Sequence, residues 1–535
     1  MPSSAAANAE EFRQRAAQAE SRSNGRLVRN TAFSLAQQVS AMALALLLVP
    51  YMLWMLGPER YGMWLSLQLF NILGLAGLAE LGFQGAIVRF LARYHAQGDR
   101  AACAGVMIAG LALFCAIGCV VAAAVILFAQ TGLATVFPFP DENAAEMRLA
   151  LSIMGAGLIT SFPALAIKAF FAGRQELSTT KVWELCDRLA FAVATLVLLQ
   201  FTTNLAMLVL IEQAIAVCLV AIFGVVAWRS SDSWRDWSAG KELRRHLRDI
   251  ARLSRPVFAA NLASQGFSRL PDLFVAVLLG PVSLTAYQIA TRIPRAIKVL
   301  QGSLNAAVLP HVAKLDRSLV EREPGSASPE AQAEFVLLGL RLNMLLAVPI
   351  LMGMSALAPL LLAIWVGSDY RDLAGYMAAF AVFQALFLLS NYAGATLTQP
   401  HHFKVFVRIN LSLLAALICV LALGLQKGGI GLLVGALVLS GVGMAGAALF
   451  VFHTIHGLPL ARIYREAIAG PVLLSAMSGL ILLAPGALML ANGQWLTGAT
   501  IIAGSGVFYA VVLYRVVLKA PERSFLTGRL RRARR

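Results

Sequence analysis

Long apolar stretches separated by short polar ones recur along almost the whole chain. In lipid, every backbone N–H and C=O must be satisfied within its own segment, so long apolar stretches of this kind form helices. A crossing needs about 20 mostly apolar residues, and the pattern therefore predicts an all-α polytopic membrane protein with about 14 transmembrane helices. We place them at roughly residues 30–56, 61–83, 101–129, 147–171, 179–200, 204–228, 256–279, 284–309, 334–365, 373–397, 404–425, 429–453, 467–490 and 494–518.

The charged residues between these stretches follow an alternating order. One set of connections is basic and holds Arg89, Arg93 and Arg100; Arg174 and Lys181; the segment 229–255; Lys314, Arg317 and Arg322; Lys404 and Arg408; Arg462 and Arg465; and the tail after Arg515. The other set is short and poor in cations, with Arg60, Asp141 to Glu142, Asp369 to Asp372, and Lys427. Loops rich in Lys and Arg stay in the cytoplasm, so we expect both termini to be cytoplasmic.

Composition narrows the class of protein further. Hydrophobic residues make up 59% and charged residues 13% of the 535 positions. A net charge of +17 would suggest nucleic acid in a soluble protein, but here the cations belong to alternate loops, so we expect no nucleic-acid partner. The six cysteines fall in apolar stretches without a CxxC pair, and no catalytic motif is present. We expect no enzyme activity, no metal and no cofactor.

The chain also shows signs of two similar halves. The basic segment 229–255 divides it after six predicted spans. The turn sequence Leu56-Gly57-Pro58, followed by Trp64, returns as Leu279-Gly280-Pro281, followed by Tyr287 at the same offset. We predict two six-helix bundles related by a pseudo-two-fold axis along the membrane normal, with a site between them. The predicted domains are a cytoplasmic tail (1–29), the first bundle (30–228), a basic cytoplasmic linker (229–255), the second bundle (256–453), two additional helices (454–518) and a basic tail (519–535).

The segment from Leu56 to Arg93 resembles a known signature. It combines Leu56-Gly57-Pro58 with Tyr61-Gly62, an acid-Leu-Gly step at Glu80-Leu81-Gly82, and Arg89 shortly after. This is similar to the polysaccharide biosynthesis proteins, the oligosaccharide-lipid flippases of the multidrug/oligosaccharidyl-lipid/polysaccharide exporter superfamily. The resemblance covers the first half well and the second half mainly in layout. It implies movement of an undecaprenyl-pyrophosphate-linked glycan across a bacterial inner membrane by alternating access, with a polysaccharide polymerase and export proteins as further partners.

Charges inside two adjacent predicted spans provide the candidate substrate site. A cation near the bilayer centre costs about 2.5 to 3.5 kcal/mol, so an unpaired cationic face has to line a wet cavity. Such a cavity suits the pyrophosphate of the cargo, because Arg offers paired donors to phosphate oxygens. Alternatively, Arg269 and Asp272, three residues apart, neutralise each other and lock two helices. The predicted substrate contacts are Arg269, Arg292, Arg295, Lys298 and Arg341, with Arg89 and Lys168 at the cytoplasmic entrance.

The first half carries acids inside its spans. Glu184 and Arg188, four residues apart, predict an ion pair within one helix. Glu80 and Glu212 have no sequence neighbour of opposite charge, so they either pair with cations of the other half to form a gate or exchange a proton or sodium ion. The gating or ion-coupling candidates are Glu80, Asp187, Glu212 and Asp272.

Two other functions remain open from the sequence. A multidrug extruder of the same superfamily would move organic cations, which fit poorly in a basic cavity, and drug-efflux assays would identify it. A membrane-embedded glycan polymerase or ligase would need a sizeable outward loop with catalytic residues, whereas the predicted outward loops here are short and poor in Arg and His.

Overall fold

The computed structural model describes residues 40, 42–44, 46–71, 74, 77, 80, 82–230, 241–297, 329–395, 397, 400–478 and 495–512. These residues are nearly all helical, and no strand occurs among them. The predicted tails 1–29 and 519–535, and Lys298, lie outside the described residues.

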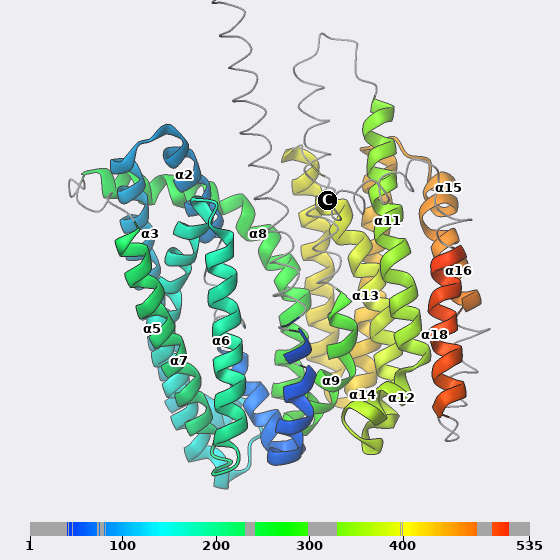
Figure 1. Cartoon of the computed structure of the whole chain (residues 1–535), viewed down its shortest axis with the longest axis horizontal. Coiled ribbons are helices and arrows are strands. Elements are labelled where there is room, and N and C mark those ends of the chain that lie inside the picture. Colours follow the sequence, from blue (N-terminus) through cyan, green and yellow to red (C-terminus); the bar gives the residue numbers. More distant parts are fainter. Residues whose placement is uncertain are drawn as a thin grey trace, which may run out of the picture. The chain divides into compact units, whose positions relative to one another are not determined.

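The chain divides into two compact units, residues 1–262 and 263–535. Unit 1 begins with the helix Met42–Gln68 and continues with α2 (Phe83–Gln97), α3 (Arg100–Thr131), α4 (Leu133–Val136), the short 3-10 turn η2 (Asp141–Asn143), α5 (Ala144–Gly173), α6 (Leu177–Leu198) and α7 (Leu205–Arg229). Helix α8 (Lys241–Leu278) starts in unit 1 and ends in unit 2. Unit 2 adds α9 (Gly280–Arg295), α11 (Pro329–Ala356), α12 (Ala358–Trp365), η4 (Ser368–Leu373), α13 (Ala374–Ala395), α14 (Pro400–Thr454), α15 (Leu460–Ile463), η5 (Tyr464–Ala469), α16 (Gly470–Ser478) and α18 (Trp495–Val512), as Figure 1 shows.

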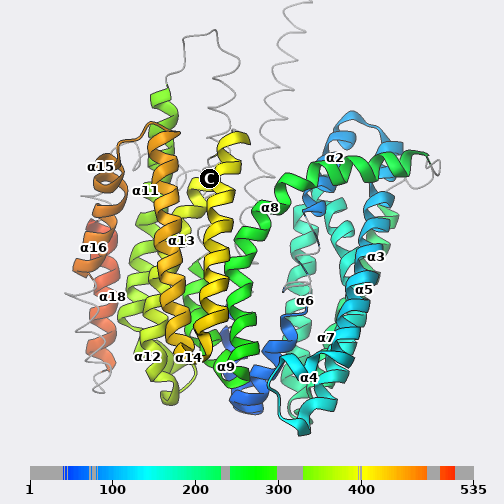
Figure 2. The ribbon, with the colours of Figure 1, turned by 180° about the vertical axis from the view of Figure 1, so that it is seen from behind.

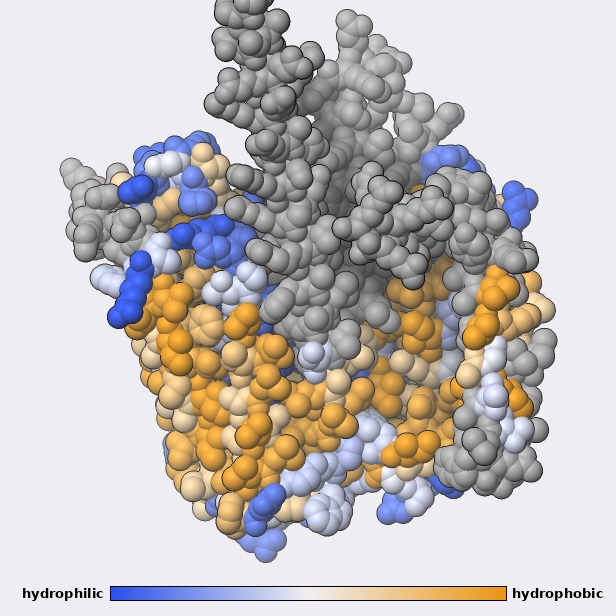
Figure 3. All heavy atoms as spheres, in the orientation of Figure 1, coloured by the Kyte–Doolittle hydropathy of each residue, from blue (hydrophilic) through white to orange (hydrophobic). Residues whose placement is uncertain are grey.

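The helices are those of a multi-pass membrane protein. Seven helices among the described residues are long and apolar enough to cross a bilayer. Large apolar side chains such as Leu47, Leu127 and Val193 are exposed on the flanks of unit 1. Figure 3 shows an apolar band on this flank with hydrophilic residues at both ends, which is the surface that a bilayer requires. The total of about 14 helices and the two-fold relation remain predictions.

Glycines mark the turns at which the chain reverses between spans. Gly57, Gly280 and Gly429 have φ angles of 74°, 84° and 58°, in the left-handed region that residues with a Cβ avoid. Two of the seven long helices contain such a glycine: Met42–Gln68 contains Gly57 and α14 contains Gly429. Figure 2 shows α14 as two helices that meet at one end. The boundaries predicted at Leu56-Gly57-Pro58 and Leu279-Gly280-Pro281 therefore coincide with real changes of direction.

We expect Gly57→Ala to destabilise unit 1 by about 1 to 2 kcal/mol, because the left-handed conformation costs an L-residue roughly this much free energy. No atom lies within 4 Å of a Cβ built at Gly57, so the new methyl group makes no clash. The loss of stability then reflects only the cost of the backbone conformation. Gly85→Ala is the matched control, since Gly85 is exposed in α2 and equally open. Alanine in a helix is favoured by about 1 kcal/mol over glycine, so thermal unfolding of the control should shift upwards and that of Gly57→Ala downwards.

Small residues bring the helices of unit 1 close together. A Cβ at Gly118 of α3 would lie 3.1 Å from the carbonyl oxygen of Leu158 and 3.1 Å from Cβ of Phe162, both on α5. In the other direction, Gly155 of α5 faces Val125 of α3. Without a hydrophobic driving force in lipid, such close contacts are a main source of helix association. They fix α3 against α5 and so set the frame that carries the polar residues of unit 1.

Unit 2 has its core between α11, α13 and α14. Val336, Leu340 and Phe452 are fully buried in one cluster, and the hydroxyl of Tyr392 donates a hydrogen bond of 3.1 Å to the carbonyl oxygen of Val336. This bond satisfies the polar end of a completely buried aromatic residue. Helix α13 also contacts α9, and this contact places its aromatic residues beside the charges of α9.

Candidate functional site

The centre of the candidate site in unit 2 is an ion pair between two consecutive helices. Asp272 on α8 is 3% exposed, and its Oδ1 atom lies 2.9 Å from Nη2 of Arg295 on α9. Nη1 of Arg295 donates a second, longer hydrogen bond of 3.4 Å to Oδ2 of the same carboxylate. The geometry is bidentate, the arrangement that guanidinium and carboxylate groups prefer.

Arg295 makes further contacts besides its ion pair with the carboxylate of Asp272. Its guanidinium carbon lies 5.4 Å from the ring centres of both Tyr287 and Phe380. It also donates to the Tyr287 hydroxyl at 3.3 Å and to Oε1 of Gln288 at 3.4 Å. A cation between two aromatic faces is stabilised by the ring quadrupoles. The sequence does not indicate that Phe380 contacts Arg295, because α13 lies far from α9 in the chain. Tyr287 is predicted from the sequence only as part of the repeated turn.

The remaining predicted cations are distributed over three elements of unit 2. Arg269 on α8 and Arg292 on α9 make no ion pair with any residue that the structure describes. Arg341 on α11 is buried. The alternative of a buried ion pair that joins two helices is confirmed with a different cation, because Asp272 pairs across the helix interface with Arg295 and not with Arg269. Asp272 acts on Arg269 only electrostatically, without an ion pair.

A buried amide without a partner lies one helical turn from Phe380. Gln384 on α13 is completely buried, and neither its amide nitrogen nor its oxygen has a hydrogen-bond partner in the described part of the chain. Its neighbours on the same helix face, Ala381 and Leu388, pack against α11. An unpaired buried amide is costly, so its position one turn from Phe380, which contacts Arg295, makes Gln384 a candidate for a role other than packing.

Replacing Gln384 with leucine should stabilise unit 2 by about 1 to 2 kcal/mol, because the unpaired polar group then disappears and the volume is kept. Transport should fall in the same variant if the amide contacts the cargo. Gln288→Leu is the comparison, since Gln288 already has a partner in Arg295 and should lose stability. Thermal unfolding in detergent measures both, and a destabilised Gln384→Leu protein would show that the amide has a partner after all.

Unit 1 contains a second polar site around a buried carboxylate. Oε2 of Glu212 on α7 accepts a hydrogen bond of 2.7 Å from Nε2 of Gln68, and Oε1 accepts one of 2.9 Å from Nδ2 of Asn71. Asn71 also donates to Oε1 of Gln68 at 3.0 Å. The carboxylate is thus held by neutral amides, and no cation forms an ion pair with it among the described residues.

Charged residues of α5 and α6 lie near this carboxylate. Asp187 on α6 is close enough to interact electrostatically with Glu212 and with Lys168 of α5. The ammonium nitrogen of Lys168 lies 5.1 Å from the ring centre of Trp183. The predicted pair between Glu184 and Arg188 is wrong: Glu184 pairs at 2.9 Å with Lys181, three residues earlier on the same helix.

The two other predicted positions of unit 1 lie at the start of α2 and on its surface. Glu80 is half-buried just before α2, close to the backbone N–H of Gln84 in the first turn of that helix. Gly82, two residues later, precedes the first helical residue and has a φ of 77°. The acid-Leu-Gly step therefore lies at the start of a helix, where the first N–H groups have no partner inside the helix. Arg89 is exposed on α2.

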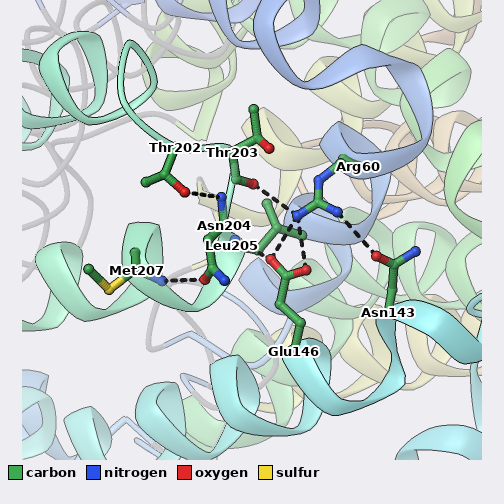
Figure 4. Close-up of polar contacts among 8 residues, drawn as sticks. All are labelled: Arg60, Asn143, Glu146, Thr202, Thr203, Asn204, Leu205 and Met207. Atoms are coloured by element: carbon green, nitrogen blue, oxygen red, sulfur yellow. Dashed lines mark hydrogen bonds and ion pairs between the residues drawn. The ribbon is translucent and has the colours of Figure 1, made fainter.

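Arg60 forms hydrogen bonds that link three connections between helices, at the end of unit 1 opposite to α2 (Figure 4). Its Nη2 atom lies 2.8 Å from Oε1 and 2.9 Å from Oε2 of Glu146, at the start of α5. The same nitrogen donates to the carbonyl oxygen of Thr203 at 2.9 Å, and Nη1 donates to Oδ1 of Asn143 at 3.1 Å. Glu146 in turn accepts a bond from the backbone N–H of Leu205 at the start of α7. The sequence placed Arg60 in an outward connection but did not indicate this network.

We expect Arg60→Ala to lower the stability of unit 1 by about 2 to 3 kcal/mol, because it removes charge-assisted hydrogen bonds to a half-buried carboxylate. Arg60→Lys should recover only part of the loss, since an ammonium cannot reproduce the forked geometry. Arg148→Ala is the control at the same end of α5: it is exposed and donates only to its own helix, at Ala144. Equal shifts in unfolding midpoint for Arg60→Ala and Arg148→Ala would contradict the assignment.

This architecture is similar to that of known membrane proteins. The family model for polysaccharide biosynthesis proteins matches residues 27–316, more than half of the chain. No curated protein has a significantly similar sequence. Among the solved structures that share the fold are lipid II flippase MurJ in an inward closed conformation, an inward-facing multidrug resistance MATE family transporter, and a MOP superfamily transporter from Pyrococcus furiosus whose binding pocket is described as reversed in polarity.

These structures are similar in shape and distant in sequence. MurJ is 12% identical over 92% of this chain and 99% of its own, with a TM-score of 0.67. The MATE transporter is 12% identical over 81% of this chain and 99% of its own, with a TM-score of 0.60. The Pyrococcus furiosus transporter is 14% identical over 82% of this chain and 96% of its own, with a TM-score of 0.56. The chain therefore belongs to the polysaccharide biosynthesis protein family and has the fold of the multidrug/oligosaccharidyl-lipid/polysaccharide exporter superfamily.

Proposed function

We propose that this protein is a flippase that moves an undecaprenyl-pyrophosphate-linked oligosaccharide across the bacterial inner membrane by alternating access. The family model is described by its role in polysaccharide biosynthesis. MurJ, which is similar in fold, is named as a flippase for lipid II. A glycan built on a lipid carrier in the cytoplasm has to reach the outer leaflet before a polymerase or export proteins outside can use it.

The observation that supports this cargo most directly is the positive charge on α8, α9 and α11 of unit 2. Asp272 is already paired with Arg295, and Arg269 and Arg292 have no ion-pair partner among the described residues. Cations at this depth are costly in a dry interior and bind pyrophosphate strongly in a wet one. We assign Arg269, Arg292, Arg295, Lys298 and Arg341 to the head group. Arg89 and Lys168 attract it at the cytoplasmic entrance.

The ion pair offers a way to link binding with movement. An incoming pyrophosphate competes with Asp272 for Arg295, because both present oxygen pairs to the same guanidinium. Once the phosphate is bound, the carboxylate loses its partner, and the ion pair between α8 and α9 is broken. Asp272 is thus the gating residue of this proposal. A cargo without a negative charge has no means of breaking the pair.

Glu212 supplies the coupling group in unit 1. Its carboxylate is surrounded by the amides of Gln68 and Asn71, and a buried carboxylate without a cation favours either protonation or a bound monovalent ion. Asp187 and Lys168 modulate its charge from α6 and α5. Glu80 contributes to gating through its position at the start of α2.

A single reconstituted system tests the cargo. Purified protein in vesicles is supplied with a fluorescent polyprenyl-pyrophosphate oligosaccharide, and its transfer between leaflets is followed by quenching from one side. Transfer that depends on the protein is the expected result. Transfer of an organic cation such as ethidium with no movement of the glycan lipid would make the protein a multidrug extruder. Lengthening of the glycan in the same vesicles would make it a polymerase or ligase.

A further inference from the structure

The first third of α8 carries two opposite faces. His246, Ile250 and Ser254 are buried at a spacing of four residues. Arg244, Arg248 and Arg252 have the same spacing and are exposed. The two rows are offset by two residues, which is about 200° around a helix, so they lie on opposite sides. Arg245 is exposed as well. We call Arg244, Arg245, Arg248 and Arg252 the basic face of α8.

The buried row fixes this segment to unit 1. The His246 ring meets Tyr94 of α2 edge-on, with 6.2 Å between ring centres. A Cβ at Gly105 of α3 would lie 2.7 Å from Nε2 of His246, so the ring and α3 are in close contact. Figure 2 shows the start of α8 running across the spanning helices, at the end of unit 1 where α2 lies. The basic face therefore points away from the helices of unit 1.

Within the described part of the chain, no carboxylate forms an ion pair with this face. The sequence from 241 to 255 has six Lys or Arg residues and two acidic ones. None of the four arginines of the basic face makes an ion pair with a described residue. Arg89, Arg93, Arg100 and Arg174 belong to the same end of unit 1, the end that the positive-inside rule assigns to the cytoplasm. A helix in this place lies at the depth of the lipid head groups.

We infer that the basic face of α8 binds the phosphodiester head groups of acidic phospholipids in the cytoplasmic leaflet. Long arginine side chains reach phosphate from a helix in the interfacial plane, and clusters of cations beside a spanning helix attract acidic lipid. An acidic phospholipid is the occupant that this position favours, because α8 extends to Leu278 and so continues into the stretch 256–279, which the sequence predicts to cross the membrane. This inference does not depend on the cargo of the proposed function.

The test uses the full chain in detergent and native mass spectrometry of bound lipid. The protein is titrated with phosphatidylglycerol and, separately, with phosphatidylcholine. In the variant Arg244→Gln/Arg245→Gln/Arg248→Gln/Arg252→Gln, the affinity for phosphatidylglycerol should fall at least about tenfold, since each lost cation removes electrostatic attraction. Phosphatidylcholine binding should stay the same. Added salt should weaken phosphatidylglycerol binding to the unmodified protein, because exposed charges are screened.

Two further variants serve as controls. Lys404→Gln/Arg408→Gln removes two exposed cations of α14 and should leave phosphatidylglycerol binding within about twofold, because scattered surface charge contributes little. The four arginines changed to lysine should retain most of the binding. If the glutamine variant elutes or unfolds abnormally, Arg244→Gln/Arg248→Gln replaces it, with a smaller loss expected.

Three outcomes would overturn the inference. The first is unchanged phosphatidylglycerol binding in the glutamine variants. The second is an equal loss in the α14 control, which would indicate a general effect of net charge. The third is displacement of the lipid by inorganic phosphate or pyrophosphate at similar concentrations, with loss of their own binding in the glutamine variant. That result would assign the face to free anions.

Discussion

Cells that carry Arg295→Gln are expected to lose at least about nine-tenths of their glycan export, because one charge-assisted contact to phosphate accounts for roughly a tenfold effect or more. The variant should also unfold more easily. Asp272 stays buried, and removing one partner of a buried ion pair typically costs about 3 to 5 kcal/mol. The contacts of the guanidinium with Tyr287 and Phe380 are lost as well.

Loss of stability and loss of function must be separated in this experiment. Asp272→Asn/Arg295→Gln removes both charges, so no unpaired charge remains and stability should return to within about 1 kcal/mol of the original protein. Export should remain low. Arg292→Gln is the matched single change on the same helix: it breaks no ion pair among the described residues, so it should reduce export while leaving stability nearly unchanged.

These variants are compared by export in cells and thermal unfolding of purified protein at equal expression. A double variant that is stable and exports normally would reduce the Asp272–Arg295 pair to a structural clamp. Arg269 and Arg292 would then have to account for the cargo alone.

Glu212→Gln is the second change for which we expect a large effect. Its side chain has nearly the same shape, and the amides of Gln68 and Asn71 can turn to present oxygen to the new NH2 group. Stability should therefore stay within about 1 kcal/mol, since every buried polar group keeps a partner. Net transport against a gradient should fall at least about tenfold, because the group that gains and loses charge has been removed.

Exchange of labelled for unlabelled cargo at equilibrium distinguishes coupling from binding. Glu212→Gln should retain exchange, because exchange needs the cargo site of unit 2 but no ion gradient. Glu212→Asp keeps a carboxylate and should recover part of the gradient-driven transport. Loss of exchange and net transport together in a stable Glu212→Gln protein would place Glu212 in the pathway of the cargo or in a gate.

The turns and the site differ in how well local sequence predicts them. A glycine followed by proline determines backbone conformation within a few residues, so Gly57 and Gly280 were identified from sequence and have the φ angles that such turns need. Ion-pair partners depend on which helices meet. Spacing along one helix suggested Arg269 for Asp272 and Arg188 for Glu184, whereas the structure pairs Asp272 with Arg295 and Glu184 with Lys181.

Spacing rules apply within one helix, so they do not predict contacts between distant segments. Glu212 and Gln68 are 144 residues apart, and Arg60 and Glu146 are 86 apart. Nothing in the local pattern around Glu212 indicates an amide partner. Likewise, the segment 229–255 was predicted as a basic linker, and the spacing of its charges did not reveal that one helix begins within it and runs on to Leu278.

Helix α8 contains the boundary between the two units, and no loop interrupts it. At about 1.5 Å per residue, its 38 residues follow a path roughly 57 Å long. Pro271 lies inside this helix in unit 2, and because its ring nitrogen carries no hydrogen, one carbonyl of the preceding turn has no helical partner. Asp272 follows directly, so a bend at this weakened step would shift the carboxylate relative to Arg295.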